Sequence, residues 1–106
     1  MITDALLRAI RNDLPMRVTL GELGRRAPPS KFFEGHLRFL CPGCGELRAT
    51  VNPANNLAHC FCCGRNLNNI DLLMSLDHDF LSAVQLLGHW LRRHQERQAR
   101  ARPAQP

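Results

Sequence analysis

Two short cysteine motifs constrain this chain more than any other feature of its sequence. Both read C-x-x-C-G, at residues 41–45 and 60–64, and 15 residues separate the last cysteine of one from the first of the other. In such a turn the backbone amides after the first cysteine fold over its thiolate, and the glycine adopts a positive φ angle. Two turns at the ends of a hairpin place four sulfurs tetrahedrally around one ion, at about 2.3 Å from it. The motifs therefore predict a metal site whose ligands are Cys41, Cys44, Cys60 and Cys63.

The donor set also indicates which ion binds and what it does. Paired C-x-x-C motifs are typical of Zn²⁺ sites, so we expect one zinc ion in the chain. Four sulfurs leave no open position for water, which favours a structural ion over a hydrolytic one. Exchanging four thiol protons for one divalent ion lowers the formal net charge by two, from +5 to +3, so the chain stays basic.

Other interpretations of the cysteines explain less of the pattern. Small buried hydrophobes would not occur in paired motifs with glycine after each, and a redox C-x-x-C occurs singly, on a strand-to-helix turn. Cys62 is one residue removed from Cys60 and would not form the same amide-to-sulfur turn, so we expect a spare thiol. Because four cysteines complete the site, we expect the histidines at the surface or in packing: His36, His59, His78, His89 and His94.

Length and charge limit the function. The 106 residues, 44% of them hydrophobic, suffice for one small domain and leave no room for a polymerase core. Lysine and arginine outnumber aspartate and glutamate by 14 to 9, and all but one of these cations are arginines, which favours an anionic partner. The carboxylates are scattered, and no nucleophile motif or phosphate-binding loop is visible, so we expect no enzyme activity from this chain alone.

The N-terminal segment and the hydropathy pattern bear on localisation. Charged side chains interrupt residues 1–16, which therefore lack the unbroken apolar stretch of a secretory signal. Nowhere does an apolar stretch reach the roughly 20 residues that span a bilayer. We therefore expect a cytoplasmic chain without membrane contact, whose thiols stay reduced and free for metal.

Periodicity predicts an α+β fold, with a small zinc-ribbon-like antiparallel β-sheet and flanking helices. Thr3 is the expected N-cap of a helix that ends near Asn12, ahead of Pro15, and residues 24–30 read as an irregular connector. Alternating patterns then predict a meander of three short strands, at residues 36–40, 48–52 and 57–61.

After Gly64 the periodicity becomes helical. Two sets of apolar residues at helical spacing, or stripes, predict two helices. We expect Asp79 to be the N-cap of the second helix and Trp90 to lie in the core. The stripes are Ile70, Leu73 and Met74, then Phe80, Val84, Leu87 and Leu91. The resulting organisation is an N-terminal helix and connector over 1–30, a metal-binding domain over 31–94 and a basic disordered tail over 95–106.

Alternation along the strands predicts one polar, basic sheet face. In the first of these strands, alternation places His36, Arg38 and Leu40 on one face and Leu37, Phe39 and Cys41 on the other. In the second, it places Arg48, Thr50 and Asn52 opposite Ala49 and Val51. Arg38, Arg48 and His59, with Phe61 or Phe39 for stacking, would bind single-stranded nucleic acid through phosphates and bases. Arg92 and Arg93, with Arg97, Arg100 and Arg102, would add phosphate contacts. The alternatives are a solvated outer sheet face and a tail that only aids solubility.

Residues 37–90 resemble the zinc-binding domain at the N-terminus of bacterial DNA primases. The likeness is densest in HCFCCG, then IDLLM, then FLSAVQLL. It implies a ribbon-like antiparallel sheet that ends in a zinc site held by the same four cysteines, with His59 and Phe61 flanking the second pair. It also implies a packing helix with Ile70, Asp71, Leu73 and Met74. The chain differs from the family in having Cys44 where histidine is usual, a shorter loop between the motifs, and residues 46–51 in place of Lys-Thr-Pro-Ser-Phe.

The resemblance implies a non-catalytic module that binds single-stranded DNA as a replication template, for example in a plasmid or another mobile element. Synthesis would then require a separate polymerase, helicase or other replication protein as partner. The alternative is a zinc-ribbon adaptor that binds another protein through the helices at residues 70–74 and 80–91.

Overall fold

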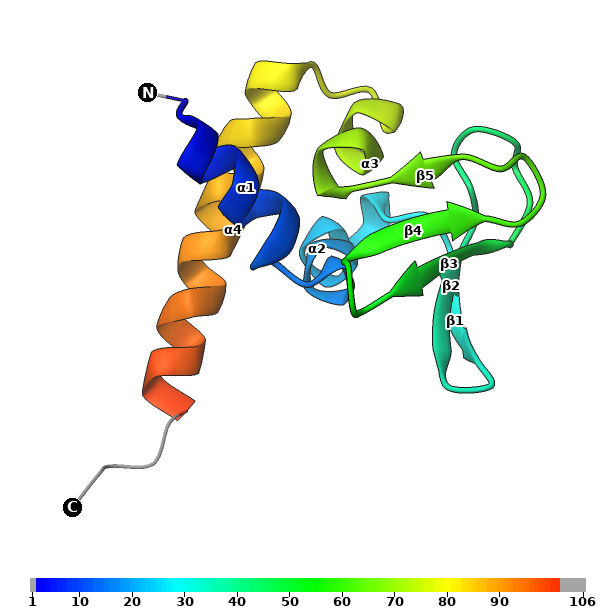
Figure 1. Ribbon diagram of the computed structural model, residues 1–106, viewed down its shortest axis with the longest axis horizontal. Coiled ribbons are helices and arrows are strands. Elements are labelled where there is room, and N and C mark those ends of the chain that lie inside the picture. The colour runs from blue at the N-terminus through cyan, green and yellow to red at the C-terminus, as the bar shows by residue number, and fades with distance from the viewer. Residues whose placement is uncertain (1, 102–106) are drawn as a thin grey trace.

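The computed structural model describes residues 2–101 and confirms the α+β class. Five antiparallel strands form one sheet in chain order, and Figure 1 shows the helices gathered on one side of it. The strands are β1 (Ser30–Phe33), β2 (His36–Phe39), β3 (Ala49–Asn52), β4 (Leu57–Cys60) and β5 (Asn66–Leu67). The helices are α1 (Asp4–Asn12), α2 (Met16–Leu23), the short 3₁₀ turn η1 (Gly24–Arg26), α3 (Asn69–Ser75) and α4 (Phe80–Ala101).

Side-chain caps set where three of the helices begin. The Thr3 hydroxyl accepts a hydrogen bond from the Leu6 N–H at 3.1 Å, which opens α1 as the sequence predicts. Asn68 and Asp71 exchange hydrogen bonds in a capping box at the start of α3. Asp79 accepts from the Ser82 N–H at 2.7 Å, so its predicted capping role is confirmed.

The sheet has two strands that the three-stranded prediction lacks, β1 and β5. Glu34 and Gly35 join β1 to β2 with positive φ angles of 51° and 81°, the backbone of a tight hairpin turn whose twist matches the strands. Consequently the domain boundary predicted at residue 31 falls inside β1. Helix α2 lies ahead of the predicted connector, in a segment for which no element was predicted, and η1 occupies the start of the connector. The three predicted strands are present, with ends that differ by at most one residue.

The core lies between the inner sheet face and the helices. Phe39, Ala49 and Cys60 are completely buried in one row across β2, β3 and β4, and Trp90 of α4 is buried as predicted. The suggestion that Phe39 could stack on a base is therefore wrong, because its ring has no exposed surface. Side chains of the helices and of the α1–α2 turn complete the core: Ile10, Leu14, Met16, Leu72, Leu73 and Leu87.

Helix α4 is longer than the sequence predicts. Residues 95–101, expected to be disordered, continue the helix to Ala101, so that prediction is wrong for this segment. The rest of the predicted tail, including Arg102, lies outside the described residues. Within residues 2–101 no helix has the length and apolar character needed to cross a membrane.

Candidate metal centre and the outer sheet face

Four cysteine side chains converge at one end of the sheet. The Sγ atoms of Cys41, Cys44, Cys60 and Cys63 all lie within 4.8 Å of one another. Cys41 and Cys63 are 3.9 Å apart, and Cys44 and Cys60 are 3.6 Å apart. A tetrahedron with metal–sulfur bonds of about 2.3 Å has edges of about 3.8 Å, so the four sulfurs fit one ion. These residues are therefore positioned to hold a metal ion, as the sequence predicts.

Two matching turns create this arrangement. In each, the glycine N–H donates to the carbonyl of the first cysteine at 2.8 Å, from Gly45 to Cys41 and from Gly64 to Cys60. Both glycines have a φ of 79°, which side chains with a Cβ rarely adopt. The Gly43 N–H also lies 3.4 Å from the Cys41 sulfur. This positive φ angle explains why a glycine follows each C-x-x-C pair, in the turn that directs the thiols toward one another.

The sheet fixes the two turns relative to each other. Cys41 follows β2 and Cys60 ends β4, and both are completely buried, whereas Cys44 and Cys63 are exposed. The loops that follow β2 and β4 lie at the same end of the sheet in Figure 1. One buried and one exposed thiol from each turn form the cluster, so the ion would join the two loops at the molecular surface.

Without a metal ion, the pKa values of three thiols in the cluster shift in different directions. Burial raises the pKa of Cys60, but hydrogen bonds from the N–H groups of Cys63 and Cys62 and from neighbouring thiols outweigh it and lower the pKa to about 6. The N–H of Glu46 lowers the pKa of Cys44, yet burial and the other thiols raise it to about 12. The Arg65 N–H and, to a smaller extent, Cys44 lower the pKa of Cys63, but burial, Cys60 and Cys41 outweigh them and raise it. The cluster holds protons at neutral pH that a metal ion must displace.

Cys62 lies outside the group of four. It occupies the place in the second turn that Gly43 has in the first, and its side chain is exposed. Its backbone N–H, but not its thiol, serves the cluster by donating toward Cys60.

The outer sheet face carries a row of polar side chains that crosses all five strands. Strand register aligns Lys31 with Arg38, Arg38 with Thr50, Thr50 with His59, and His59 with Asn66. His59 Nδ1 lies 2.9 Å from Asn66 Oδ1, which fixes the imidazole on β4. The alternation predicted for β2 and β3 therefore places Arg38 and Thr50 together on this face.

Aromatic rings are interleaved with these cations. The Arg38 guanidinium lies over the Phe33 ring at 4.4 Å from its centroid, and the Lys31 ammonium lies at 6.0 Å. His59 packs edge-on against Phe61 with ring centroids 4.7 Å apart, and 60% of Phe61 is exposed. The Arg48 carbonyl accepts from the Phe61 N–H at 3.2 Å, so the backbones of these two residues are neighbours. The face thus offers two exposed rings beside three cations.

Two polar atoms at the centre of this face have unused hydrogen-bonding capacity. Arg38 Nε and Thr50 Oγ1 are buried and have no hydrogen-bond partner among the described residues. A buried polar group without a partner costs free energy that a ligand can recover. Their position in adjacent strands favours a polar ligand at the middle of the row.

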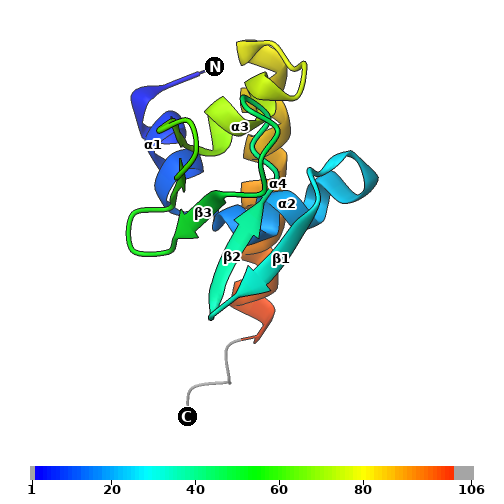
Figure 2. The same cartoon turned by 90° about the vertical axis from the view of Figure 1, so that its right-hand side faces the viewer.

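The structure divides the predicted nucleic-acid contacts into two groups. Arg38, Arg48, His59 and Phe61 belong to the outer face, whereas Arg92 and Arg93 lie on α4, behind the sheet in Figure 2. Sequence reasoning missed Lys31 and Phe33, which β1 brings to the face. Gly35, a residue that favours a hairpin turn, was a local signal for that strand, although residues 30–33 do not alternate between polar and apolar side chains.

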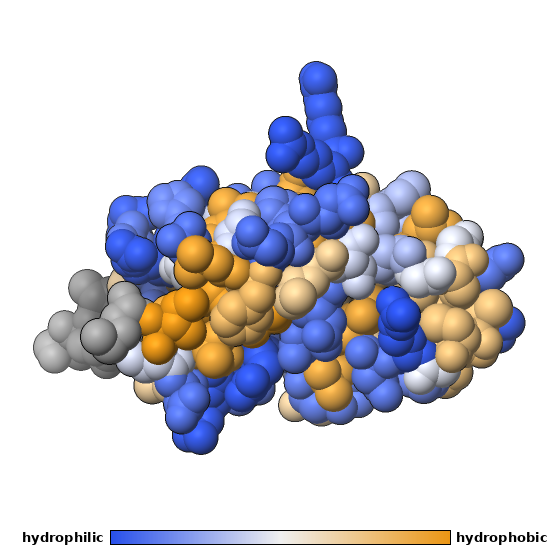
Figure 3. All heavy atoms as spheres, turned by 90° about the horizontal axis from the view of Figure 1, so that it is seen from above, coloured by the Kyte–Doolittle hydropathy of each residue, from blue (hydrophilic) through white to orange (hydrophobic). Residues whose placement is uncertain are grey.

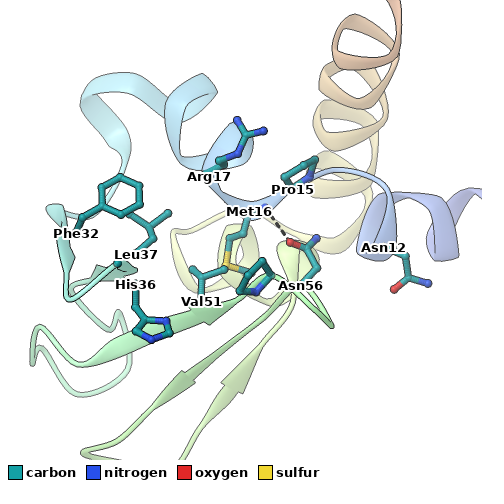
Figure 4. A pocket seen from close by; sticks show the side chains of 11 residues that line it. Asn12, Pro15, Met16, Arg17, Phe32, His36, Leu37, Val51 and Asn56 are labelled. Atoms are coloured by element: carbon teal, nitrogen blue, oxygen red, sulfur yellow. Dashed lines mark hydrogen bonds between the residues drawn. The ribbon is translucent and has the colours of Figure 1, made fainter. Parts of the chain in front are cut away.

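A pocket of about 470 Å³ lies where the sheet divides into two hairpins. Strands β2 and β3 pair only at Arg38–Thr50 and Phe39–Ala49, and beyond these pairs the β1–β2 hairpin diverges from β3 (Figure 2). Figure 4 shows the apolar side chains that line the pocket, with Arg17 and His36 among the polar ones. The same view shows the hydrogen bond from the Met16 N–H to the Asn56 side chain, which is 2.9 Å long and joins two of the lining residues.

No protein-family model matches this chain, and no curated protein matches it. The assignment of function therefore rests on the metal centre and the outer sheet face.

Proposed function

We propose that this chain is a zinc-stabilised, non-catalytic module that binds single-stranded DNA across its outer sheet face. The observation that carries the proposal is the alternation of cations and rings, in which Arg38 covers Phe33 and His59 packs against Phe61. Exposed rings can stack on bases, and the neighbouring guanidinium groups can contact the phosphates between them. A duplex hides its bases, so a stacking surface of this kind suits a single strand.

Zinc is the ion that we propose for the cysteine cluster. Four thiolates in a tetrahedral arrangement are the donor set that structural Zn²⁺ sites use, and they leave no position for a reacting water. The two turns otherwise contribute few apolar contacts, because Cys44 and Cys63 are exposed. When bound, the ion would supply a cross-link between the loops after β2 and β4, and would thereby hold β3 and β4 beside Arg38.

A role in DNA replication beside a separate polymerase is the proposal that the primase resemblance supports. The sequence HCFCCG carries that resemblance, and its His59 and Phe61 lie on the proposed binding face. Phosphoryl transfer needs acidic residues that hold magnesium. Of the close pair Asp77 and Asp79, Asp79 caps α4 instead, and Asp77 lies in the turn before the helix with a φ of 72°. We therefore expect no primer from this chain when it is incubated with template, nucleotides and magnesium. Primer synthesis that Asp77→Asn abolishes would contradict the proposal.

Titration of labelled oligo(dT) at several salt concentrations tests DNA binding. We expect micromolar or weaker affinity and, for about four phosphate contacts, a log–log salt slope near −3, at roughly −0.7 per phosphate. The Arg38→Ala, Arg48→Ala variant should lower the magnitude of the slope by about 1.4. The control is Arg8→Ala, Arg11→Ala, which removes the same charge from exposed positions on α1. Equal binding by the two variants would contradict the assignment of the face.

A second candidate function, binding of a partner protein, is favoured by an apolar groove between α1 and α4. Ile2, Leu6 and Leu81 line it, and 53% of Leu81 is exposed. Figure 3, which looks down on this end of the molecule, shows hydrophobic side chains gathered there. Leu81→Asp should abolish binding of such a partner while oligo(dT) binding stays unchanged. A partner held equally well by the variant would exclude the groove.

A further inference from the structure

The second half of α4 carries a basic stripe on the other side of the molecule from the outer sheet face. Arg93, Arg97 and Arg100 are spaced by four and three residues, so they lie on one face of the helix. At a rise of about 1.5 Å per residue, they follow one another at intervals of about 6 and about 4.5 Å. Figure 1 shows α4 at the left and the sheet at the right, and in Figure 2, which views the molecule from the sheet side, α4 lies behind the strands.

The positive charge of this stripe is only partly compensated, by Glu22 and by Glu96 of α4 itself, which lies three residues from Arg93 and four from Arg100. Among the described residues its only ion pair joins Arg93 Nη1 to Glu22 Oε2 at 3.5 Å. Arg17 of α2 is a further cation near this stripe. Burial is the main cause that lowers the pKa of the buried His94 from its usual 6.5, and the charges of Arg97 and Arg17 lower it further. Like charges three and four residues apart on a helix repel each other, and a bound polyanion relieves that repulsion.

Packing against the rest of the protein does not explain why the end of α4 is helical. His94 is the last buried residue of α4, and all of residues 95–101 are exposed. A helix that is polar on every side has no apolar face to bury against the protein. The end of α4, residues 93–101, therefore forms a largely exposed helical rod, with Asp13 after α1 as a neighbour of Gln95, Gln98 and Ala99.

We propose that this rod, with Arg93, Arg97 and Arg100 as its contacts, binds the phosphate backbone of double-stranded DNA. A helix with side chains is about 10–12 Å across, close to the roughly 12 Å width of the major groove of B-DNA. Residues 95–101 contain no aromatic ring for stacking on unpaired bases, in contrast to the outer sheet face. The inference does not rest on single-strand binding by the sheet. Where both hold, the chain binds a junction between single and double strands.

Binding of a short blunt-ended duplex and of oligo(dT) of equal length, measured by fluorescence anisotropy on the metal-loaded protein, tests this inference. We expect Arg97→Gln, Arg100→Gln to weaken duplex binding at least about tenfold and to lower the salt slope by about 1.8, at about 0.9 per phosphate. Oligo(dT) binding should change by less than about twofold. Arg38→Ala, Arg48→Ala should do the reverse, so failure of either proposal can be recognised separately.

The matched control is Gln95→Ala, Gln98→Ala, which alters the same helical turns without changing charge. Its duplex affinity should equal that of the parent. Duplex binding by Arg97→Gln, Arg100→Gln within about twofold of the parent would overturn the inference, and so would an equal loss of duplex and oligo(dT) binding. Metal content and thermal unfolding of each variant establish that the exposed substitutions leave the fold intact.

Discussion

The side-chain amides of Asn56 and Asn69 donate to the same acceptor, the carbonyl oxygen of Leu14, at 2.7 and 2.8 Å. Asn56 belongs to the turn between β3 and β4, and Asn69 is the first residue of α3. The turn that joins α1 to α2 is therefore fastened to the sheet and to α3 at one buried point. This contact fixes α2 beneath the β1–β2 hairpin that carries Arg38 and Phe33.

Replacing Asn56 should destabilise the fold strongly. Its side chain accepts from the Met16 N–H and donates to the carbonyls of Arg11 and Leu14, so Asn56→Ala leaves several buried polar groups unpaired. We expect a loss of about 2–3 kcal/mol in the free energy of unfolding, measured by urea denaturation. Asn55→Ala, which removes a hydrogen bond at an exposed position, should cost less than about 1 kcal/mol. Equal losses in the two variants would show that the shared contact contributes little.

Substitution of single cysteines should separate the four ligands from the spare thiol. Cys44→Ser and Cys63→Ser should lower zinc content and the melting temperature, because each removes one of four sulfurs that lie within 4.8 Å. Cys62→Ser should retain about one zinc ion per chain, since its thiol lies outside that group. Elemental analysis with thermal unfolding measures both. A lower zinc content in Cys62→Ser than in Cys63→Ser would mean that the second ligand pair is wrongly assigned.

Metal binding should release protons and weaken as the pH falls. The metal-free cluster keeps Cys44 protonated at neutral pH, with a pKa of about 12, and the pKa of Cys63 is raised as well. Both protons must leave when the ion binds, so protons compete with metal and acid favours the metal-free form. Titration with zinc in a weak buffer containing a pH indicator should release at least two protons per ion. Release of less than one would contradict the coupling described here.

His94 should make stability depend on pH in a second way. Burial is the main cause that lowers its pKa below 6.5, so the unfolded chain takes up the proton more readily than the folded one. Its contribution is therefore present above about pH 6.5 and is lost as the pH falls through the lower folded pKa. His94→Gln should show a flatter decline of unfolding free energy between about pH 6.5 and 5 than the parent. His89→Gln, at an exposed position on the same helix, should decline like the parent.

The metal cluster could be predicted from the sequence because its geometry is local. A C-x-x-C-G turn contains its own hydrogen bonds, including the one from Gly45 to Cys41, and needs little help from the rest of the fold. The caps at Thr3 and Asp79 are local in the same sense.

The elements that sequence reasoning missed depend on distant contacts or on an existing helix. Helix α2 begins at Pro15 without a side-chain cap and contains Gly21, and its order comes from buried residues such as Leu20. Strand β1 is exposed along its length and is fixed by pairing with β2. Residues 95–101 extend a helix that Trp90 and Leu91 already anchor, so no new nucleation is required. Arginine, glutamine and alanine are also good helix formers.

Photocross-linking tests the central claim, that the outer sheet face binds single-stranded DNA, most directly. An oligonucleotide with 5-bromodeoxyuridine in place of thymidine reacts with rings that stack on it, and mass spectrometry of the digested protein identifies the attachment site. We predict attachment to peptides that contain Phe61 or Phe33, the two rings that lie beside the cations of this face. Attachment confined to α4, with none in residues 31–39 or 48–61, would contradict the account.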